Sequence, residues 1–279
     1  MRVAVTGSSG FIGRHVLSEL VRNHVDVVAV TRDAGRLKDL PPGIRVLEMD
    51  IAMPGEDPFL QLGRPDLMLH LAWDGLPNYQ SKHHYELELP RQYAFLKSII
   101  ESGLTSLLVS GTCFEYGRQY GPLHEEMPVQ PDNSYGFAKD ALRRQIEFLK
   151  TSTPFAFTWT RIFYTYGENQ HESSLYTQLR SAVRRRDRTF SMSGGEQLRD
   201  YLTVAEVSRA IVALALRRVD HGIVNVCSGK PISVRRFAES LLQENGWKIE
   251  LDLGRYPYSS HEPMAFWGDD RKLRKSLKQ

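Results

Sequence analysis

Three glycines near the start of the chain constrain its fold more than any other feature. The apolar run Val3–Val5 leads into glycines at positions 7, 10 and 13, and a helical pattern resumes at Phe11. Glycines at this spacing let the backbone turn sharply after a strand, approach a pyrophosphate closely and pack the next helix on that strand. The helix N-terminus then offers unpaired N–H groups to an anion. The candidate dinucleotide contacts are Gly7, Ser9, Gly10, Phe11, Ile12 and Gly13.

Short apolar, β-branched runs alternate with amphipathic stretches along the chain. Further strands are expected at 25–31, 44–49, 66–72, 105–110, 155–161 and 223–226, and helices at 11–23, 84–102, 135–151 and 204–217. This alternation predicts an α/β fold of Rossmann type, a doubly wound parallel sheet of about seven strands. We expect residues 1–165 and about 201–226 to form the dinucleotide-binding domain. The less regular segments 166–200 and 227–279 are expected to form a smaller substrate domain.

Composition bounds the partners and the compartment. The 279 residues are 41% hydrophobic and carry a formal net charge of +3, which fits a globular protein with a large core. So small an excess of positive charge suits an anionic substrate and does not indicate nucleic-acid binding. The two cysteines make no disulfide framework, and neither a membrane-spanning run nor a signal peptide is evident. We therefore expect a cytoplasmic protein, without a metal site because the pair His83-His84 lacks suitably spaced partners.

The end of the second expected strand bears on the choice of cofactor. A carboxylate there would hold a ribose 2′-hydroxyl and favour NAD. Thr31 and Arg32 stand in that place, and Arg36 follows. Guanidinium groups suit a 2′-phosphate, so the sequence predicts NADP(H). NAD(H) stays as the alternative because Asp33 can turn toward the ribose. Candidate contacts at the end of the third strand are Asp50 and Ile51.

The chemistry is expected in the middle of the chain. Tyr135 and Lys139 are four residues apart, which places both on one face of a helix. An ammonium beside a phenol lowers the phenol's pKa and lets it exchange a proton near neutral pH. Thr112 follows the fifth strand, at the sheet edge where such folds bind ligands, and can bond the same reacting oxygen. We therefore predict Thr112, Tyr135 and Lys139 as the catalytic set.

The motifs that carry a family resemblance lie along most of the chain: the turn at 6–13, His70-Leu71-Ala72, the Tyr135/Lys139 pair, Arg199-Asp200-Tyr201-Leu202 and Phe266-Trp267-Gly268-Asp269. In this combination the chain resembles the extended short-chain dehydrogenase/reductases of the nucleotide-sugar epimerase/dehydratase type. The resemblance implies that Leu71, Ala72, Tyr135 and Lys139 contact the cofactor. It also implies a nucleoside-diphosphate sugar (dTDP-, GDP-, CDP- or UDP-linked) as substrate and a homodimer formed through two long helices.

The same resemblance implies a set of substrate contacts. Arg199 matches the residue that grips the diphosphate, while Arg255 and Glu262 are similar to residues that hold the phosphate and the nucleoside ribose. Two positions depart from the family pattern, since Glu88 and Tyr164 each replace an Asn. The expected substrate-binding residues are Thr112, Cys113, Tyr164, Arg199, Arg255 and Glu262.

The residues after Thr112 separate the reactions of this family. A 4,6-dehydratase carries an acidic pair there, but this chain has Cys113 and Phe114, which disfavours dehydration. The Thr31-Arg32 pair favours a reductase, and the chain looks like bacterial reductases of 4-keto-6-deoxy nucleotide sugars. Hydride would reach C4 and Tyr135 would supply the proton. The alternatives are an NAD-dependent nucleotide-sugar 4-epimerase and a non-catalytic NADP-binding sensor or scaffold.

Overall fold

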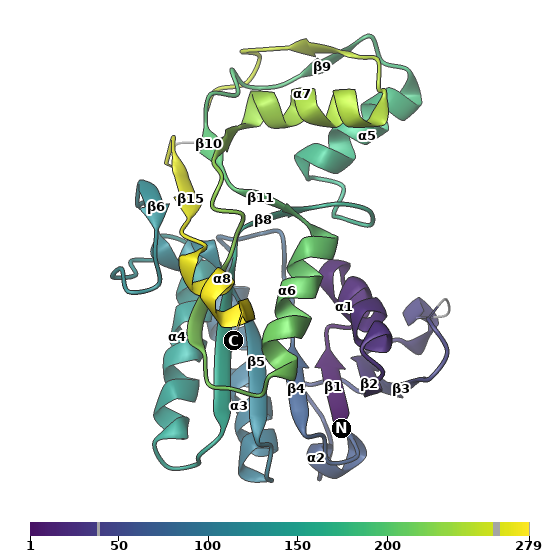
Figure 1. Ribbon diagram of the computed structural model, residues 1–279, viewed down its shortest axis with the longest axis vertical. Coiled ribbons are helices and arrows are strands. Elements are labelled where there is room, and N and C mark those ends of the chain that lie inside the picture. Colours follow the sequence, from purple (N-terminus) through teal and green to yellow (C-terminus); the bar gives the residue numbers. More distant parts are fainter. Residues whose placement is uncertain (38–39, 259–262, 279) are drawn as a thin grey trace.

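A parallel sheet of seven strands forms the centre of the computed structural model, which describes residues 1–37, 40–258 and 263–278. The strand order is β12-β7-β5-β4-β1-β2-β3 (Figure 1). This confirms the expected doubly wound sheet, because the order reverses at β1 and β4. The strands are β1 (Arg2–Thr6), β2 (Asp26–Thr31), β3 (Ile44–Glu48), β4 (Leu67–His70), β5 (Ser106–Thr112), β7 (Ala156–Ile162) and β12 (Gly222–Val226).

Helices bury both faces of the sheet. On one face α1 (Phe11–Arg22), α6 (Val204–Leu216) and α8 (Arg271–Lys278) pack over a core that includes Val3 and Ile211. On the other, α3 (Leu89–Glu101) and α4 (Ser134–Lys150) pack over a core that includes Ala4 and Phe95, with the short α2 (Pro58–Gln61) beside α3. Burial on both faces explains why the strands are continuous apolar runs.

The two long helical segments differ slightly from their expected bounds. The expected helix 84–102 is divided into the π-helical turn η2 (His84–Glu88) and α3. Pro90, in the first turn of α3, has no N–H to donate to the preceding turn, which accounts for the irregular winding there. None of the helices in the described ranges is long and apolar enough to cross a membrane.

A second layer lies beyond the carboxyl ends of the strands (Figure 1). There α5 (Leu175–Arg185) and α7 (Val234–Asn245) share a core cluster of their own, which includes Leu179 and Phe237. The parallel pair β9 (Thr189–Ser191) and β14 (Glu250–Asp252) completes it. The other short pairs are β8 (Tyr164–Tyr166) with β11 (Tyr201–Thr203), β10 (Leu198–Arg199) with β13 (Ile232–Ser233), and β6 (Gly121–Leu123) with β15 (Phe266–Gly268).

The C-terminal helix differs from its expected place. Segment 227–279 was expected in the substrate domain, but Leu273 of α8 is buried in the core of the sheet, and Leu277 packs against that core. The apolar stripe of α8 is thus covered by α6 and β12 rather than by the α5–α7 layer.

Candidate active site

The glycine turn after β1 is packed too tightly for side chains at two of its glycines. Gly7 has a φ of +67°, and a Cβ there would lie 2.7 Å from the backbone N of Ala72. A Cβ on Gly13 would lie 2.2 Å from the Gly7 carbonyl oxygen. The N-cap of α1 is Gly10, which has no side chain to accept from the first N–H groups of the helix. These groups can therefore bind an anion.

A pocket extends from this turn along the carboxyl ends of β1, β2 and β4. The predicted cofactor contacts that line it are Gly7, Ser9, Gly10, Thr31, Arg32, Arg36, Asp50, Ile51, Leu71 and Ala72. Phe11, Ile12 and Gly13 form the adjoining first turn of α1. The other lining residues were not predicted as cofactor contacts: Thr6, Val30, Met49, Ala52, Trp73, Asp74, Glu88 and Arg91. The only sequence signal for Trp73 and Asp74 was their position just after β4.

At the end of β2 the polar side chains are already engaged. The Thr31 hydroxyl donates to Ser9 Oγ over 3.2 Å, which ties β2 to the glycine turn. Asp33 Oδ1 accepts from the Gly35 N–H at 2.8 Å, so this carboxylate closes a local turn. Arg32 forms an exposed ion pair of 3.2 Å with Asp74, across the pocket from β2 to the segment after β4.

Lys139 is buried at the centre of the site. Its Nζ donates to the Ser110 carbonyl oxygen over 2.8 Å and lies 4.1 Å from the centroid of the Trp73 ring. The Tyr135 ring packs against Trp73 and His84, with centroids 5.8 and 5.4 Å away. The Trp73 indole N–H donates to His84 Nδ1, which fixes the indole between Lys139 and Tyr135.

Burial dominates the electrostatics of this pair. It raises the pKa of the Tyr135 phenol above its ordinary value, and the nearby Tyr79, Glu115 and Cys113 act in the same direction. Burial also lowers the pKa of Lys139 to about 7, against the opposing effect of Glu115 and Glu88. The expected lowering of the Tyr135 pKa by Lys139 is therefore wrong for this structure. Desolvation outweighs a cation that lies 5.9 Å from the phenol ring centroid.

Thr112 ends β5 and caps the 3-10 turn η3 (Cys113–Tyr116). Its backbone N–H donates to Glu115 Oε1 at 2.8 Å, and its hydroxyl accepts from the Phe114 N–H. The η3 turn packs closely on the start of α4, because a Cβ on Gly136 would lie 2.6 Å from the Phe114 carbonyl oxygen. The turn that carries Thr112 and the first turn of α4, which carries Tyr135, are thus neighbours.

The structure brings only some of the predicted substrate residues together. Arg199 is buried, with its guanidinium 4.7 Å from the Phe266 ring centroid and 5.8 Å from that of Tyr164. Cys113 is buried beside Thr112. Arg255 is exposed and forms an ion pair with Asp252 in the α5–α7 layer. Glu262 lies outside the described residues. Over the described ranges, no three His, Cys, Asp or Glu residues form a group that could hold a metal ion.

Comparison with known proteins gives consistent matches along the chain. A model described as the NAD dependent epimerase/dehydratase family matches residues 3–227. The dTDP-6-deoxy-L-talose 4-dehydrogenase (NAD(+)) of Aggregatibacter actinomycetemcomitans is 30% identical over 270 residues, which cover 96% of this chain and 99% of that protein. A UDP-glucose 4-epimerase of Corynebacterium glutamicum is 25% identical over 99% of this chain and 90% of its own length.

Solved structures share the fold over the whole chain. MoeE5 in complex with UDP-glucuronic acid and NAD superimposes with a TM-score of 0.83 at 23% identity, covering 100% of this chain and 93% of that one. UDP-glucuronic acid 4-epimerase from Bacillus cereus, in complex with UDP-glucuronic acid and NAD, gives a TM-score of 0.84 at 21% identity, again over 100% and 93%.

Proposed function

This chain belongs to the NAD dependent epimerase/dehydratase family, and we propose that it is an NAD(P)-linked oxidoreductase acting at C4 of a nucleoside-diphosphate 6-deoxy sugar. In the direction that we favour, it reduces a 4-keto group to a hydroxyl. The observation that carries this proposal is the packing of Tyr135 and Lys139 on α4 against the turn that begins at Thr112. Cys113 and Phe114 follow Thr112 and supply no acid for a dehydration. The name of the 30% identical relative, a 4-dehydrogenase of a 6-deoxy sugar, adds support.

In this proposal each residue of the catalytic set has a separate task. The bound cofactor supplies the hydride chemistry at C4. Tyr135 holds the proton that passes to O4 as the carbonyl is reduced, and the Thr112 hydroxyl orients the same oxygen. Lys139, fixed by the Ser110 carbonyl, places a positive charge beside the site. Burial of these groups excludes water and strengthens their electrostatic effect on the developing oxyanion.

For the cofactor we propose a nicotinamide adenine dinucleotide bound along the pocket that begins at Gly7. Arg32 and Arg36 line that pocket and support NADP(H). The pairing of Arg32 with Asp74 and the NAD named for the relatives favour NAD(H). Titration of the protein with NADH and NADPH, followed by nicotinamide fluorescence, decides between them.

We assign the nucleotide sugar to the space between the strand ends and the α5–α7 layer. The buried Arg199, held among aromatic rings, is the proposed diphosphate contact. The domain division proposed on this basis assigns segment 166–200 and residues 227–258 to the substrate unit and leaves α8 with the sheet. The proposed homodimer uses the outer faces of α3 and α4.

The proposal is tested with a panel of dTDP-, GDP-, CDP- and UDP-linked 4-keto-6-deoxy sugars and either reduced cofactor. We expect cofactor oxidation with at least one sugar, and a Tyr135→Phe variant that loses about 10²–10⁴-fold in turnover while it still binds cofactor. Near-normal turnover by this variant would show that Tyr135 is not the proton donor.

A second candidate, a 4-epimerase, is favoured by the names of several relatives and structural neighbours. An epimerase returns its hydride to the same sugar, so it would purify with bound cofactor and need none added. Conversion of a UDP-hexose to its C4 epimer without added cofactor, together with failure to oxidise NAD(P)H, would favour this candidate.

A further inference from the structure

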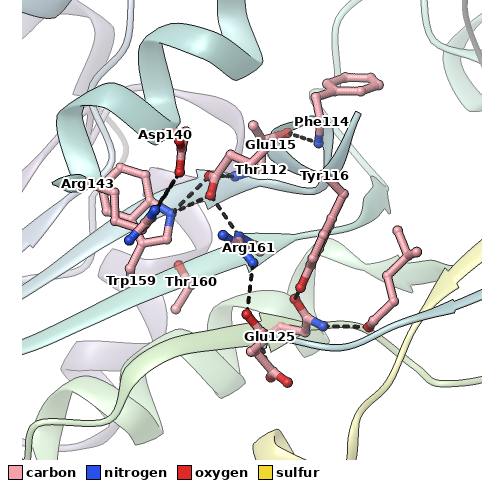
Figure 2. Close-up of polar contacts among 12 residues, drawn as sticks. Thr112, Phe114, Glu115, Tyr116, Glu125, Asp140, Arg143, Trp159, Thr160 and Arg161 are labelled. Carbon is pink, nitrogen blue, oxygen red and sulfur yellow. Dashed lines mark hydrogen bonds and ion pairs between the residues drawn. The ribbon is translucent and has the colours of Figure 1, made fainter. Parts of the chain in front are cut away.

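One buried carboxylate in the site has no task in the mechanism above. Glu115 has an exposed fraction of 0%, and Figure 2 shows it between the ends of two strands. It accepts hydrogen bonds from the Thr112 N–H (2.8 Å), from the Trp159 indole N–H (2.9 Å) and from Arg161 Nε (2.8 Å). A buried charge is costly unless it is paired and hydrogen-bonded, so this set of donors has to form as a unit.

We propose that Glu115 is a positioning residue for the proposed C4 reaction: it fixes Thr112 at the end of β5 and supplies a buried negative charge that acts on Lys139. This inference rests on the proposed function for its chemistry. Its structural basis is independent of the substrate, because it follows from contacts within the chain.

Close packing around Gly111 lets Glu115 reach β7 beside Thr112. Thr112 pairs with Ile162 and Gly111 with Arg161 where β5 and β7 lie side by side. A Cβ on Gly111 would lie 2.1 Å from the Trp159 indole nitrogen and 2.5 Å from Glu115 Oε1. Only glycine at 111 therefore leaves room for the carboxylate to reach β7, directly before Thr112.

Arg161 is itself held from a third strand. Its guanidinium lies 4.4 Å from the Tyr116 ring centroid, and the Tyr116 hydroxyl donates to Asn225 Oδ1 of β12 over 2.7 Å (Figure 2). Residues from β5, β7 and β12 thus hold the η3 turn at both of its ends. The Thr112 backbone cannot move from its place at the strand end without breaking the hydrogen bond to Glu115.

The charge of Glu115 also acts on the buried Lys139. Lys139 is 1% exposed. The titratable groups that interact with it electrostatically are His70 of β4, His84 and Glu88 of η2, and Glu115 of η3. Tyr135 faces it from its own helix. Burial lowers the pKa of Lys139 to about 7, and Glu115 is the largest opposing influence. Removal of that carboxylate would therefore lower the pKa of Lys139 further and favour its neutral amine.

The test compares Glu115→Gln with Glu115→Asp, which keeps the charge, and with Glu147→Gln as a matched control. Glu147 is also a paired carboxylate, because it forms an ion pair with Arg143 on α4. Its side chain is 42% exposed, whereas Glu115 is fully buried. Thermal melts first establish that each variant is folded. We then measure turnover, cofactor affinity and the pH dependence of kcat/KM with the 4-keto sugar.

For Glu115→Gln we expect a loss of turnover of about tenfold or more, because the orientation of Thr112 and the charge of Lys139 are both disturbed. Cofactor affinity should be largely kept, because the glycine turn after β1 is unchanged. The alkaline limb of the pH profile should move to lower pH by about one unit, since Lys139 gives up its proton more readily. Glu115→Asp should restore the position of that limb, and Glu147→Gln should match the wild type in every measurement.

NMR of ¹³C-labelled lysine, with Lys139 assigned from the Lys139→Arg variant, reads the same titration without any turnover. This separates the two proposals. A wild-type protein inactive on every 4-keto sugar would refute the reductase, whereas an unchanged Lys139 titration in Glu115→Gln would refute the role of Glu115. If Glu115→Gln does not fold, Glu115→Asp becomes the test. We expect Lys139 in that variant to titrate near the pH at which it titrates in the wild type. A displaced titration would overturn the inference.

Discussion

A chain of single residues links the phosphate-binding turn to the helical side of the pocket. Thr6 Oγ1 lies 2.9 Å from His70 Nδ1, His70 Nε2 bonds to Gln92 Oε1, and Gln92 Nε2 donates to Glu88 over 2.5 Å. His70 is fully buried, and burial lowers its pKa to about 3. The imidazole is therefore neutral at pH 7, with Nε2–H donating to Gln92 and Nδ1 accepting from Thr6.

This histidine should make the fold sensitive to acid. Its folded pKa of about 3 lies below the 6.5 of an ordinary histidine, so the unfolded chain binds more protons between these values. Stability is fully present above 6.5 and is lost as the pH falls toward 3. We expect urea denaturation of His70→Asn to show a pH slope in this window that is smaller by up to about 1.4 kcal/mol per unit. The exposed His171→Asn should keep the wild-type slope; parallel curves for all three proteins would contradict the assignment.

At the scale of elements, two turns beside helices offer a matched pair of glycines, Gly7 between β1 and α1 and Gly246 at the end of α7. Gly7 and Gly246 both have a positive φ, +67° and +64°, but only a Cβ on Gly7 would meet another segment, at Ala72. Gly246→Ala should cost about 1–2 kcal/mol of unfolding free energy from backbone strain. Gly7→Ala should cost more, because its Cβ would also collide with the Ala72 backbone. Only Gly7→Ala should also weaken cofactor binding, by more than about tenfold in a fluorescence titration. Equal cofactor affinity in the two variants would place the dinucleotide elsewhere.

The ion pair between the end of β2 and the segment after β4 bears on cofactor choice. Asp74 holds Arg32 over 3.2 Å, and Asp74→Asn should free the guanidinium for a 2′-phosphate. Because exposed pairs are worth at most about 1 kcal/mol, we expect the NADPH/NADH affinity ratio to rise by up to about fivefold. Asp26→Asn, which removes a similarly exposed pair with Arg2, is the control. A ratio that stays the same in Asp74→Asn would show that Arg32 does not face the 2′ position.

The elements of the sheet could be predicted from sequence because burial on both faces leaves continuous apolar runs. The short strand pairs outside this sheet could not be predicted from sequence. Gly121–Leu123 pairs with Phe266–Gly268 far along the chain, and neither segment has a period of its own. Glu115 is similar: its partner Arg161 lies 46 residues later, and only the adjacency of β5 and β7 reveals the pair. The site residues that sequence did predict are those in fixed local spacings, such as Tyr135 and Lys139.

At the scale of the whole molecule, the proposed nucleotide-sugar site lies where two separately packed layers meet. The sheet with its helices has two core clusters, one on each face, and the α5–α7 layer has another, centred on residues such as Phe237. The layer lies beyond the carboxyl ends of the strands, the edge at which folds of this type bind ligands (Figure 1).

The outer face of α4 carries the remaining prediction. Phe137 and Phe148 are 52% and 78% exposed, and their spacing of eleven residues is close to three helical turns, so they share one stripe. Exposed aromatic residues in line on a helix favour a protein partner, and we propose a second copy of this chain. Phe148→Glu should then convert a dimer into monomers in sedimentation equilibrium, because two glutamates would face each other across the two-fold axis. Met53, 79% exposed in a loop, provides the matched change Met53→Glu, which should leave the dimer intact. A monomeric wild type, or dimers that survive Phe148→Glu, would assign the stripe to another role.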